Sequence, residues 1–501
     1  MASPLAIETA IFPAYTARVE RLALPRPSYA LTRAALMATL LAAPLAFGAV
    51  QPWAWGTLAV VAFLLLLLWL MESARRGSLT LLWSPLYLPA AAFFLLGTIQ
   101  LGGGLTMDRI ATRESLLKLS TDLILFFLAG QIFGAGDYVK FGRGKGAHYS
   151  RSRMGSDRLP WGAAGSDILP DRPLPGSNLS PDVLSESRSA SPLSADILSD
   201  KTRPEAALAW IIVAYAFLLA LFAIFQFFSG QGLIYWRVKS PGWTFGPYVN
   251  HNHYAGLMEM LIPLAVAGAL PALRRRAPAL VVGAVVLIPV ASLLLAGSRG
   301  GFISLLVEIG LAAALVFGWG PRHARRATAL VGGTAMLAAA LLFFWMAPRH
   351  VAERLATLAD TAHPPEVELR TRWVAARDAL RIWRDHPALG SGLGSFETVF
   401  PRYQSFATDF RWDYAHNDYA QALAETGAAG GAALLAALGM FFWLAFRNLR
   451  ERLRHTAGWI PFAAALGCCG LLAHSFVDFN LHIPANAAWF AVSVAIATSG
   501  R

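Results

Sequence analysis

Long runs of apolar residues, separated by short polar segments, form the main pattern along the chain. Each run has about 20 residues, the length that an α-helix needs to cross the hydrocarbon core of a bilayer. A helix satisfies its own backbone hydrogen bonds, so runs of this kind cross lipid as helices. The pattern predicts an all-α polytopic membrane protein with about twelve transmembrane helices, at residues 30–48, 55–71, 81–99, 116–135, 205–228, 254–272, 278–297, 301–318, 328–347, 418–445, 457–477 and 485–499.

The composition agrees with a membrane protein. The 501 residues are 56% hydrophobic and 14% charged, whereas soluble domains carry about 25% charged residues. The formal net charge of +12 comes from Lys and Arg clustered between the apolar runs. No basic stripe is interleaved with stacking aromatic residues, so we expect no nucleic-acid partner. The adjacent Cys468 and Cys469 lie inside an apolar run, which favours packing over a disulfide or a metal site.

Basic loops give the expected orientation of the helices. Three short loops, at 273–278, 321–326 and 447–455, are strongly basic and are therefore expected in the cytoplasm by the positive-inside rule. Alternation of the helices from these loops places both termini inside, together with the pair Arg75 and Arg76. The four basic clusters agree on one topology.

Two long segments divide the predicted helices into blocks. Residues 136–203 are rich in Ser, Pro, Gly, Asp and Arg and have no apolar period, so we expect a disordered cytoplasmic insert, either a linker or a regulatory segment. The first four helices precede it, within 1–135. Helices five to nine fill 204–347, a large outer loop covers 348–416, and the last three helices fill 417–501.

The outer loop contains one helical pattern. Its apolar residues recur at intervals of three and four, which predicts one apolar face of a helix. Pro387 and the glycines after it end the pattern. We expect this amphipathic helix to lie along the outer membrane–water boundary. The apolar positions are Leu369, Trp373, Ala376, Leu380 and Trp383.

Polar residues gather on the outer side in segments that are far apart in sequence. Polar side chains at the rim of a membrane cost free energy and usually have a function, so we expect these segments to converge on one outer pocket. They are "TFGPYVNHNHYAG" (244–256), "GSRGG" (297–301), the loop that carries Arg370, Arg372 and His416, and "HSFVDFNLHIPAN" (474–486).

Each of these residues also has a structural alternative. Arg299 can extend to the lipid headgroups, and the polar residues from Asn250 to His253 can cap the next helix. The H-x-H spacing within them lacks supporting carboxylates, so we predict no metal ion and no other cofactor. His474 and Asp478 lie one helical turn apart and can satisfy each other inside the bundle.

His416 is the candidate general base. It stands beside Asn417 and Asp418, which can hold one tautomer of the ring or can instead cap the next helix. A histidine near its unperturbed pKa of about 6.5 accepts a proton near neutral pH. Arginines that converge on the same pocket suit a diphosphate, because guanidinium groups match phosphate oxygens. These parts favour transfer of a group from a lipid diphosphate to an alcohol.

The order of the motifs resembles that of the O-antigen ligase and polymerase superfamily. The combination of "GLGSF" with "HNDY" and "ETG" is specific, whereas "GSRGG" alone is weak. The resemblance covers roughly residues 205–490 and rests on "FGPYVNHNHYAG", "GSRGG", "HPALGSGLGSF", "HNDYAQALAETGAAG" and "HSFVDFNLHIPAN".

The resemblance implies a multi-pass protein of the bacterial inner membrane, with a GT-C-like architecture and an active site that faces the periplasm. It implies a metal-independent, inverting glycosyltransferase whose donor is an undecaprenyl-diphosphate-linked glycan. The other partners are a lipid or glycan acceptor and membrane lipids. By the same resemblance, His416 is the base, and Arg299 and Arg370 hold the diphosphate. The remaining substrate-binding candidates are Asn250, His253, Arg372, Asn417, Asp418, His474 and Asp478.

Several activities stay open at this level. An O-antigen ligase transfers the glycan to lipid A–core, whereas a polymerase joins lipid-linked repeat units. Both use the same donor, so the motifs do not separate them, and protein O-glycosylation is a third option. A transporter also fits twelve helices with both termini inside. A carrier, however, places its key charges near the bilayer midplane in two related halves, and this chain shows rim charges and no internal repeat.

Overall fold

The computed structural model describes residues 29–77, 79–134, 138–141, 203–240, 242–274, 279–319, 369–408, 411–452 and 459–499, with isolated positions between 325 and 333. The chain divides into two units, Met1–Phe141 with Ala209–Arg501 and Gly142–Leu208. Nearly all of the second unit lies outside the described residues. The described chain is mostly helical, in agreement with the predicted all-α class.

Four helices form the N-terminal part. The Asp108 carboxylate caps the last of them by accepting from the backbone N–H groups of Ile110 and Ala111. Pro52 begins the second helix, where a missing N–H costs nothing. The helices are α1 (Ala30–Leu45), α2 (Pro52–Arg75), α3 (Tyr87–Gly102) and α4 (Arg109–Phe133).

Strand β1 (Leu79–Leu82) pairs antiparallel with β2 (Tyr138–Phe141). The second of these strands lies in the segment for which the sequence predicts a disordered insert. The rest of that insert, up to the start of α6, lies outside the described residues.

The remaining elements follow in chain order. Four helices and a short hairpin of β3 (Leu233–Ile234) and β4 (Val238–Lys239) come first; the helices are α6 (Arg203–Ser229), α7 (His251–Arg274), α8 (Ala279–Ala296) and α9 (Arg299–Trp319). Then come α12 (Leu369–Asp385), α13 (Phe396–Val399), the 3₁₀ helix η5 (Phe400–Arg402), α14 (Asp418–Arg452), α15 (Trp459–His474), the 3₁₀ helix η7 (Asn480–His482) and α16 (Pro484–Thr498).

Among the described residues, α2, α4, α6, α9 and α14 are each long and apolar enough to cross a membrane, and shorter apolar helices accompany them. Helices lie at eleven of the twelve predicted spans. The other predicted span, 328–347, falls outside the described residues except for isolated positions. The chain is therefore a helical membrane protein with several spans.

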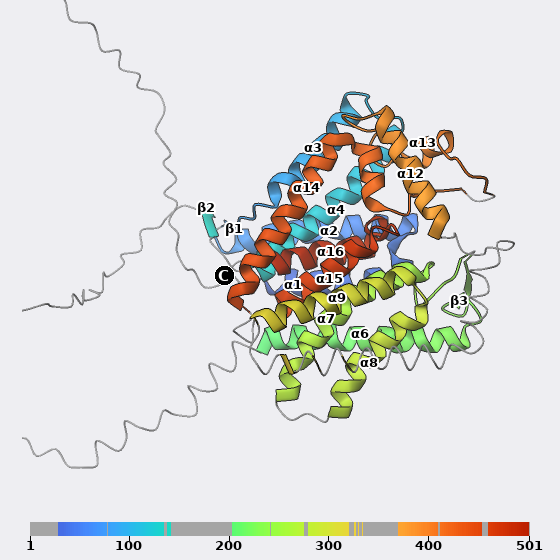
Figure 1. The fold of residues 1–501 in the computed structure, drawn as a ribbon. Helices are drawn as coiled ribbons and strands as arrows, with labels where there is room; N and C mark the ends of the chain where they lie inside the picture. The colour runs from blue at the N-terminus through green and yellow to red at the C-terminus, as the bar shows by residue number, and fades with distance from the viewer. Residues whose placement is uncertain are drawn as a thin grey trace, which may run out of the picture. The chain divides into compact units, whose positions relative to one another are not determined.

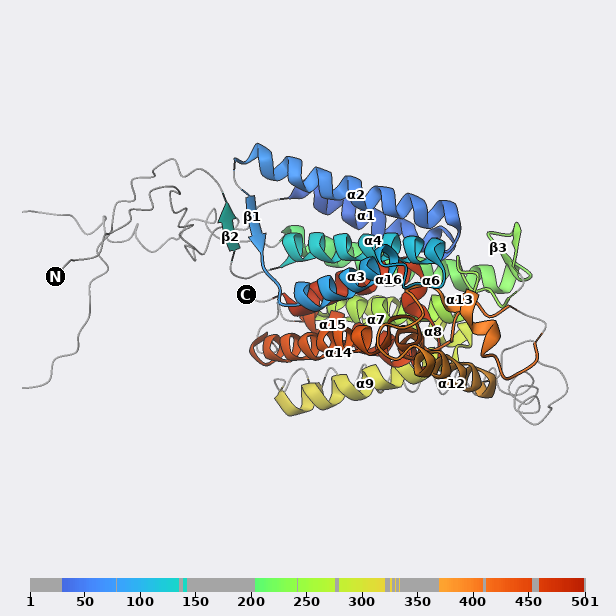
Figure 2. The ribbon, with the colours of Figure 1, turned by 90° about the horizontal axis from the view of Figure 1, so that it is seen from above.

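The helices lie side by side, and α15 and α16 are central in the bundle (Figure 1). Helix α15 packs against α7 and α9, and α16 packs against α4 and α1. Figure 2 shows β1, which follows α2, at one end of the helices and α12, α13 and β3 at the other. The polar segments of the sequence therefore gather at the end where α14 and α16 begin.

Helix α12 is amphipathic as predicted, and its alanines form the face that packs against the protein. Ala375, Ala379 and Ile382 are buried, whereas Trp373 and Leu380 are 54% and 39% exposed. The small alanines allow α12 to approach α14 and the aromatic residues around Phe400 closely. The large apolar side chains of Trp373 and Leu380 are therefore left on the outward face, and the predicted place of α12 along the membrane–water boundary stays a prediction.

At a break in the helix α14, the motif "ETG" contacts the segment that follows α12. Gly427 has φ 62° and ψ −162°, a conformation that is essentially restricted to glycine. At this break the N–H groups of Ala428 and Ala429 donate to the carbonyls of Pro387 and Ala388, at 2.8 and 3.1 Å. The chain after α12 is thus held against α14 by backbone hydrogen bonds.

Side chains strengthen the same junction. The Glu425 carboxylate accepts from the N–H groups of Gly394 and Phe396, at 2.8 and 3.2 Å. Gln100, buried in α3, donates to the carbonyls of Leu389 and Glu425. "ETG" and "GLGSF" are therefore one structural unit, and α3 of the N-terminal part is tied to it.

Replacing Gly427 with Ala should lower the free energy of unfolding by about 2 kcal/mol or more, because the backbone conformation becomes strained and a Cβ would lie 2.5 Å from the Ala388 carbonyl. The measurement is thermal unfolding of the detergent-purified protein. Gly439→Ala in the same helix is the matched control, since a Cβ there meets nothing within 4 Å. Equal melting temperatures for the two variants would contradict this role of the break.

Candidate functional site

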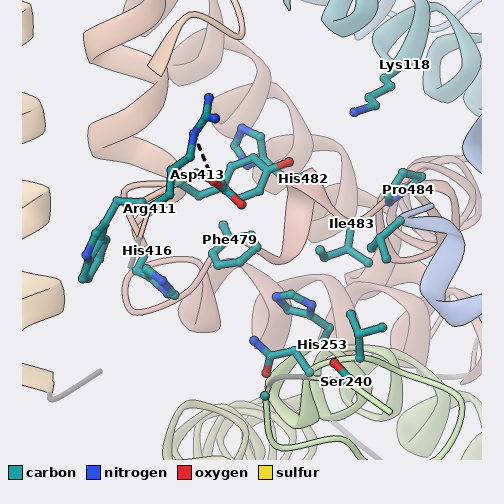
Figure 3. Close-up of a pocket in the computed structure, with 16 residues that line it drawn as sticks. Lys118, Ser240, His253, Arg411, Asp413, His416, Phe479, His482, Ile483 and Pro484 are labelled. Atoms are coloured by element: carbon teal, nitrogen blue, oxygen red, sulfur yellow. Dashed lines mark ion pairs between the residues drawn. The ribbon is translucent and has the colours of Figure 1, made fainter. Parts of the chain in front are cut away.

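Three segments supply most of the lining of a cavity of about 430 Å³ at the end where α14 begins, and Val50 and Lys118 of the N-terminal part complete it. They are the start of α7, the loop before α14 and the turn between α15 and α16. Figure 3 shows the side chains that line it, which include three histidines and several aromatic rings. The histidines are His253, His416 and His482, and the rings include Trp412, Tyr414 and Phe479.

The carboxylate of Asp478 lies behind the cavity and is fully buried. The Arg372 guanidinium donates to it at 3.1 Å. His253 Nε2 and His416 Nδ1 lie 3.5 and 3.9 Å from its other oxygen. Burial alone would raise the pKa of Asp478, but Arg372 and the two imidazoles hold it well below its usual range. Asp478 is therefore an ionised carboxylate shared by one guanidinium and two rings.

His416 adopts a backbone conformation that is rare for a residue with a side chain, with φ 50°. Its ring packs edge to face against Trp412 and Phe479, with centroids 5.1 and 4.8 Å away. Burial lowers the pKa of His416 to about 3, although the Asp478 charge opposes this shift. The ring is therefore neutral at physiological pH. The sequence had predicted an ordinary histidine pKa, which the burial changes.

The aromatic ring of Phe479 separates the two histidines that face Asp478. His253 meets it edge to face on one side at 4.7 Å, and Tyr414 stacks on it at 4.4 Å. The Nε2 atom of His253 faces the Asp478 carboxylate at 3.5 Å, whereas its Nδ1 is buried without a hydrogen-bond partner among the described residues. His253 lines the cavity, and Nδ1 is the nitrogen that Asp478 leaves unpaired.

A second pair of carboxylate and imidazole lies beside the first. Asp418 Oδ1 is 2.7 Å from His482 Nδ1, and Oδ2 accepts from the Ser475 hydroxyl at 2.7 Å. Burial alone would lower the pKa of His482, but the hydrogen bond and charge of Asp418 raise it. The sequence singled out Asp418 but missed His482. The available signal was a histidine in the same polar motif, just before the proline that begins α16.

Two predicted residues act as helix caps. The Asn417 side-chain oxygen accepts from the Ala420 N–H at 2.9 Å, and its amide donates to the Phe476 carbonyl. The Asn250 side chain lines the cavity and accepts from the Asn252 N–H at 2.8 Å. The capping alternative therefore describes both asparagines, and Asn250 also faces the cavity.

His474 lies away from the cavity lining and pairs with a residue that the sequence did not single out. Its Nδ1 is 2.7 Å from Glu259 Oε1, and both side chains are buried. The expected pairing of His474 with Asp478 is wrong, because a carboxylate on α7 is closer. Gly300 and Gly301 pack directly against this pair. The glycines of "GSRGG" thus leave room for a buried His–Glu contact.

The two arginines that the resemblance assigns to the diphosphate are placed differently. Arg299 begins α9 and is exposed, outside the cavity lining. Arg370 lies in α12, but its side chain is outside the described residues. Of the predicted basic residues, the structure brings Arg372 to the site, through Asp478.

No group of three His, Cys, Asp or Glu side chains is arranged to hold a metal ion in the described part of the chain. The polar groups present are imidazoles, a buried carboxylate and a guanidinium, together with aromatic rings. Such a set can position a neutral base beside a hydroxyl and offer stacking surfaces to a sugar.

Replacing His416 with Gln should make the stability less sensitive to acid. The folded ring stays neutral down to about pH 3, whereas an unfolded histidine protonates below about pH 6.5. Lowering the pH from 7.5 to 5.5 therefore favours unfolding by about 1.4 kcal/mol through this residue. The melting temperature of the variant should fall less over this range than that of the parent. The control is His386→Gln at the end of α12, which should keep the parent's dependence; a variant with the parent's full sensitivity would contradict the buried neutral ring.

Residues 283–435 match the family described as O-antigen ligase. The matched segment includes Arg299, Arg370 and His416, whereas His253 and Asp478 lie outside it. No curated protein matches the chain. The family match confirms, through residues 283–435, the resemblance of this chain to the O-antigen ligase and polymerase superfamily.

Proposed function

We propose that the protein transfers a glycan from an undecaprenyl-diphosphate-linked donor to an acceptor hydroxyl, at the periplasmic face of the bacterial inner membrane. The observation that carries the proposal is the neutral ring of His416 at a cavity, beside a buried carboxylate, inside the segment that matches the O-antigen ligase family. The leading acceptor is lipid A–core, and the proposed architecture is GT-C-like.

In the proposed reaction the acceptor oxygen attacks the anomeric carbon of the donor sugar. His416 takes the hydroxyl proton as the new C–O bond forms. The bond between the anomeric carbon and the phosphate oxygen breaks, and its electron pair leaves with the diphosphate. Attack from the side opposite to the leaving group inverts the anomeric centre. No metal ion is part of this proposal.

The contacts of His416 suggest which ring atom acts. Nδ1 faces the Asp478 carboxylate at 3.9 Å, so the hydrogen of the neutral ring is placed on Nδ1 and Nε2 is the basic atom. Asp478 then stabilises the imidazolium that forms when Nε2 accepts the proton. A ring with a pKa of about 3 is a weak base. This pKa already includes the favourable effect of Asp478, and the negative charge of the donor would favour protonation of the ring further during transfer.

Arg299 and Arg370 are proposed to neutralise the departing diphosphate, on the basis of the resemblance. Arg299 is exposed at the first turn of α9 and is available to a ligand. Asn250 and His253 are proposed to contact the substrates, because both line the cavity. Arg372, Asp418 and Asp478 act behind them as positioning residues, through the contacts described above.

His416→Ala should reduce glycan transfer by at least about a hundredfold, which is the usual contribution of a general base. Expression, membrane insertion and melting temperature should stay close to those of the parent. His386→Ala, in the same matched segment but outside the cavity, is the matched control and should transfer normally. Full transfer by His416→Ala would refute the mechanism.

Incubation of the purified protein with lipid-linked repeat units alone separates the ligase from the polymerase. We expect no ladder of longer chains, and product only after lipid A–core is added, because the matched family is that of O-antigen ligases. A ladder without the core acceptor would instead establish a polymerase.

A further inference from the structure

Lys118 is an ionisable side chain within a helix that the sequence presents as a membrane span. It lies on α4 and lines the cavity (Figure 3). Its ammonium group sits over the ring of Trp55, 5.1 Å from the centroid, and the side chain is 30% exposed. Ionisable residues in spans are costly and are usually retained for a function at a cavity or pathway.

The cavity has two chemically different sides. Figure 3 shows Lys118 near Ile483 and Pro484 on one side, and His416 on the opposite side. Val50 adds a further apolar surface to the lining. A cationic group beside apolar side chains suits the junction between a phosphate and a lipid chain.

The charges of the lining leave Lys118 available to a ligand. Its ion-pair partner, Glu114 at 2.6 Å, is one turn away on the same helix and is 43% exposed, and exposed pairs of this kind are weak. The carboxyl group of Asp122, one turn away in the other direction along α4, also interacts with the charge of Lys118. Arg411, another basic residue of the lining, already contacts the carboxylates of Glu397 and Asp413. The Arg411 side chain is 70% exposed, so its pairs are weak as well and a phosphate can compete for either cation.

A second potential cation faces the same space. The positive charge of Lys118 opposes protonation of the His482 ring, so the two groups lie within electrostatic range of each other. An anion between them would relieve this repulsion. The His482 ring already faces the Asp418 carboxylate at 2.7 Å, so Lys118 supplies the positive charge on this side of the lining, with apolar side chains beside it.

We infer that Lys118 binds a phosphate group of a lipid-anchored substrate on this side of the cavity. The inference rests on the proposed function, because it places the phosphate in a transferase site. In an inverting displacement the base and the leaving group lie on opposite sides of the anomeric carbon, and Lys118 lies across the cavity from His416. The phosphate belongs either to the donor diphosphate, which this geometry favours, or to a phosphorylated glycolipid acceptor.

The test measures binding of undecaprenyl diphosphate to the full-length protein in lipid nanodiscs. Lys118→Met removes the charge and keeps much of the volume, and it should weaken binding about tenfold, since a lost charge-assisted hydrogen bond has this effect. Lys118→Arg should restore most of the affinity. Glu114→Gln and Arg113→Gln are the controls on the same helix, and both should bind as the parent does. Arg113 is exposed and outside the cavity lining.

A parallel series with a phosphorylated glycolipid acceptor, and with the same lipid after phosphatase treatment, identifies the source of the phosphate. A loss of affinity confined to the phosphorylated acceptor would support the site and assign it to the acceptor. Parent-like binding of both lipids by Lys118→Met would overturn the inference. An equal loss in Glu114→Gln would also overturn it, because Lys118 would then act only through its helix partner.

His416→Ala separates this inference from the proposed function. It should bind undecaprenyl diphosphate normally and fail to transfer. If His416→Ala transfers normally, the proposed function fails irrespective of Lys118. If it fails to transfer while Lys118→Met binds every lipid as the parent does, only the role of Lys118 is refuted.

Discussion

The buried charge of Asp478 is the constraint on which the candidate site depends. Taking a carboxylate out of water costs several kcal/mol unless other charges and hydrogen bonds compensate. Here the compensation comes from Arg372 on α12, from the backbone N–H of Phe479 at 2.8 Å, and from two imidazoles. One carboxylate therefore holds α7, α12, the loop before α14 and the turn after α15 in a common arrangement.

Two further carboxylates, those of Asp418 and Glu259, stabilise the same arrangement through contacts of their own. Asp418 binds the same turn through His482 and Ser475, and Glu259 of α7 binds His474 at the end of α15. Gly300 permits this last contact, because a Cβ there would lie 2.4 Å from the His474 ring, and a Cβ at Gly301 would lie 2.8 Å from Ala255 of α7. The polar motifs of the sequence are thus neighbours in space, and the carboxylate of one motif contacts imidazole or other polar groups, several of them from another motif.

The sequence was sufficient to predict features with a local cause. Apolar runs of about 20 residues predict helices because a span must satisfy its backbone internally, and the polar segments before α7 and α14 could be assigned to one end from the basic loops alone. His416 could be proposed as a base from its position and neighbours. Each of these predictions depends only on the hydrophobicity, charge or identity of residues that are close to one another in sequence.

Features that depend on which helices become neighbours could not be predicted in this way. The face of α12 that packs against the protein consists of its alanines because α14 comes close, and the periodicity of the apolar residues did not indicate this face. His474 forms its close side-chain contact with Glu259, 215 positions away in sequence, and not with Asp478, which is one turn away. His482 belongs to a polar motif in which other residues were selected as candidates, and Lys118 belongs to a segment that was interpreted only as an apolar span. Their role appears only when the cavity wall is assembled.

The cavity wall is built from both ends of the chain. His416 lies within the segment matched to the O-antigen ligase family, whereas Val50, in the turn before α2, and Lys118, on α4, lie outside it. Gln100 and Asp108 tie these helices to the loop that follows α12. Substitutions in the N-terminal part can therefore change the shape of the cavity while residues 283–435 stay the same. The space beside His416 can thus vary independently of the segment that matches the O-antigen ligase family.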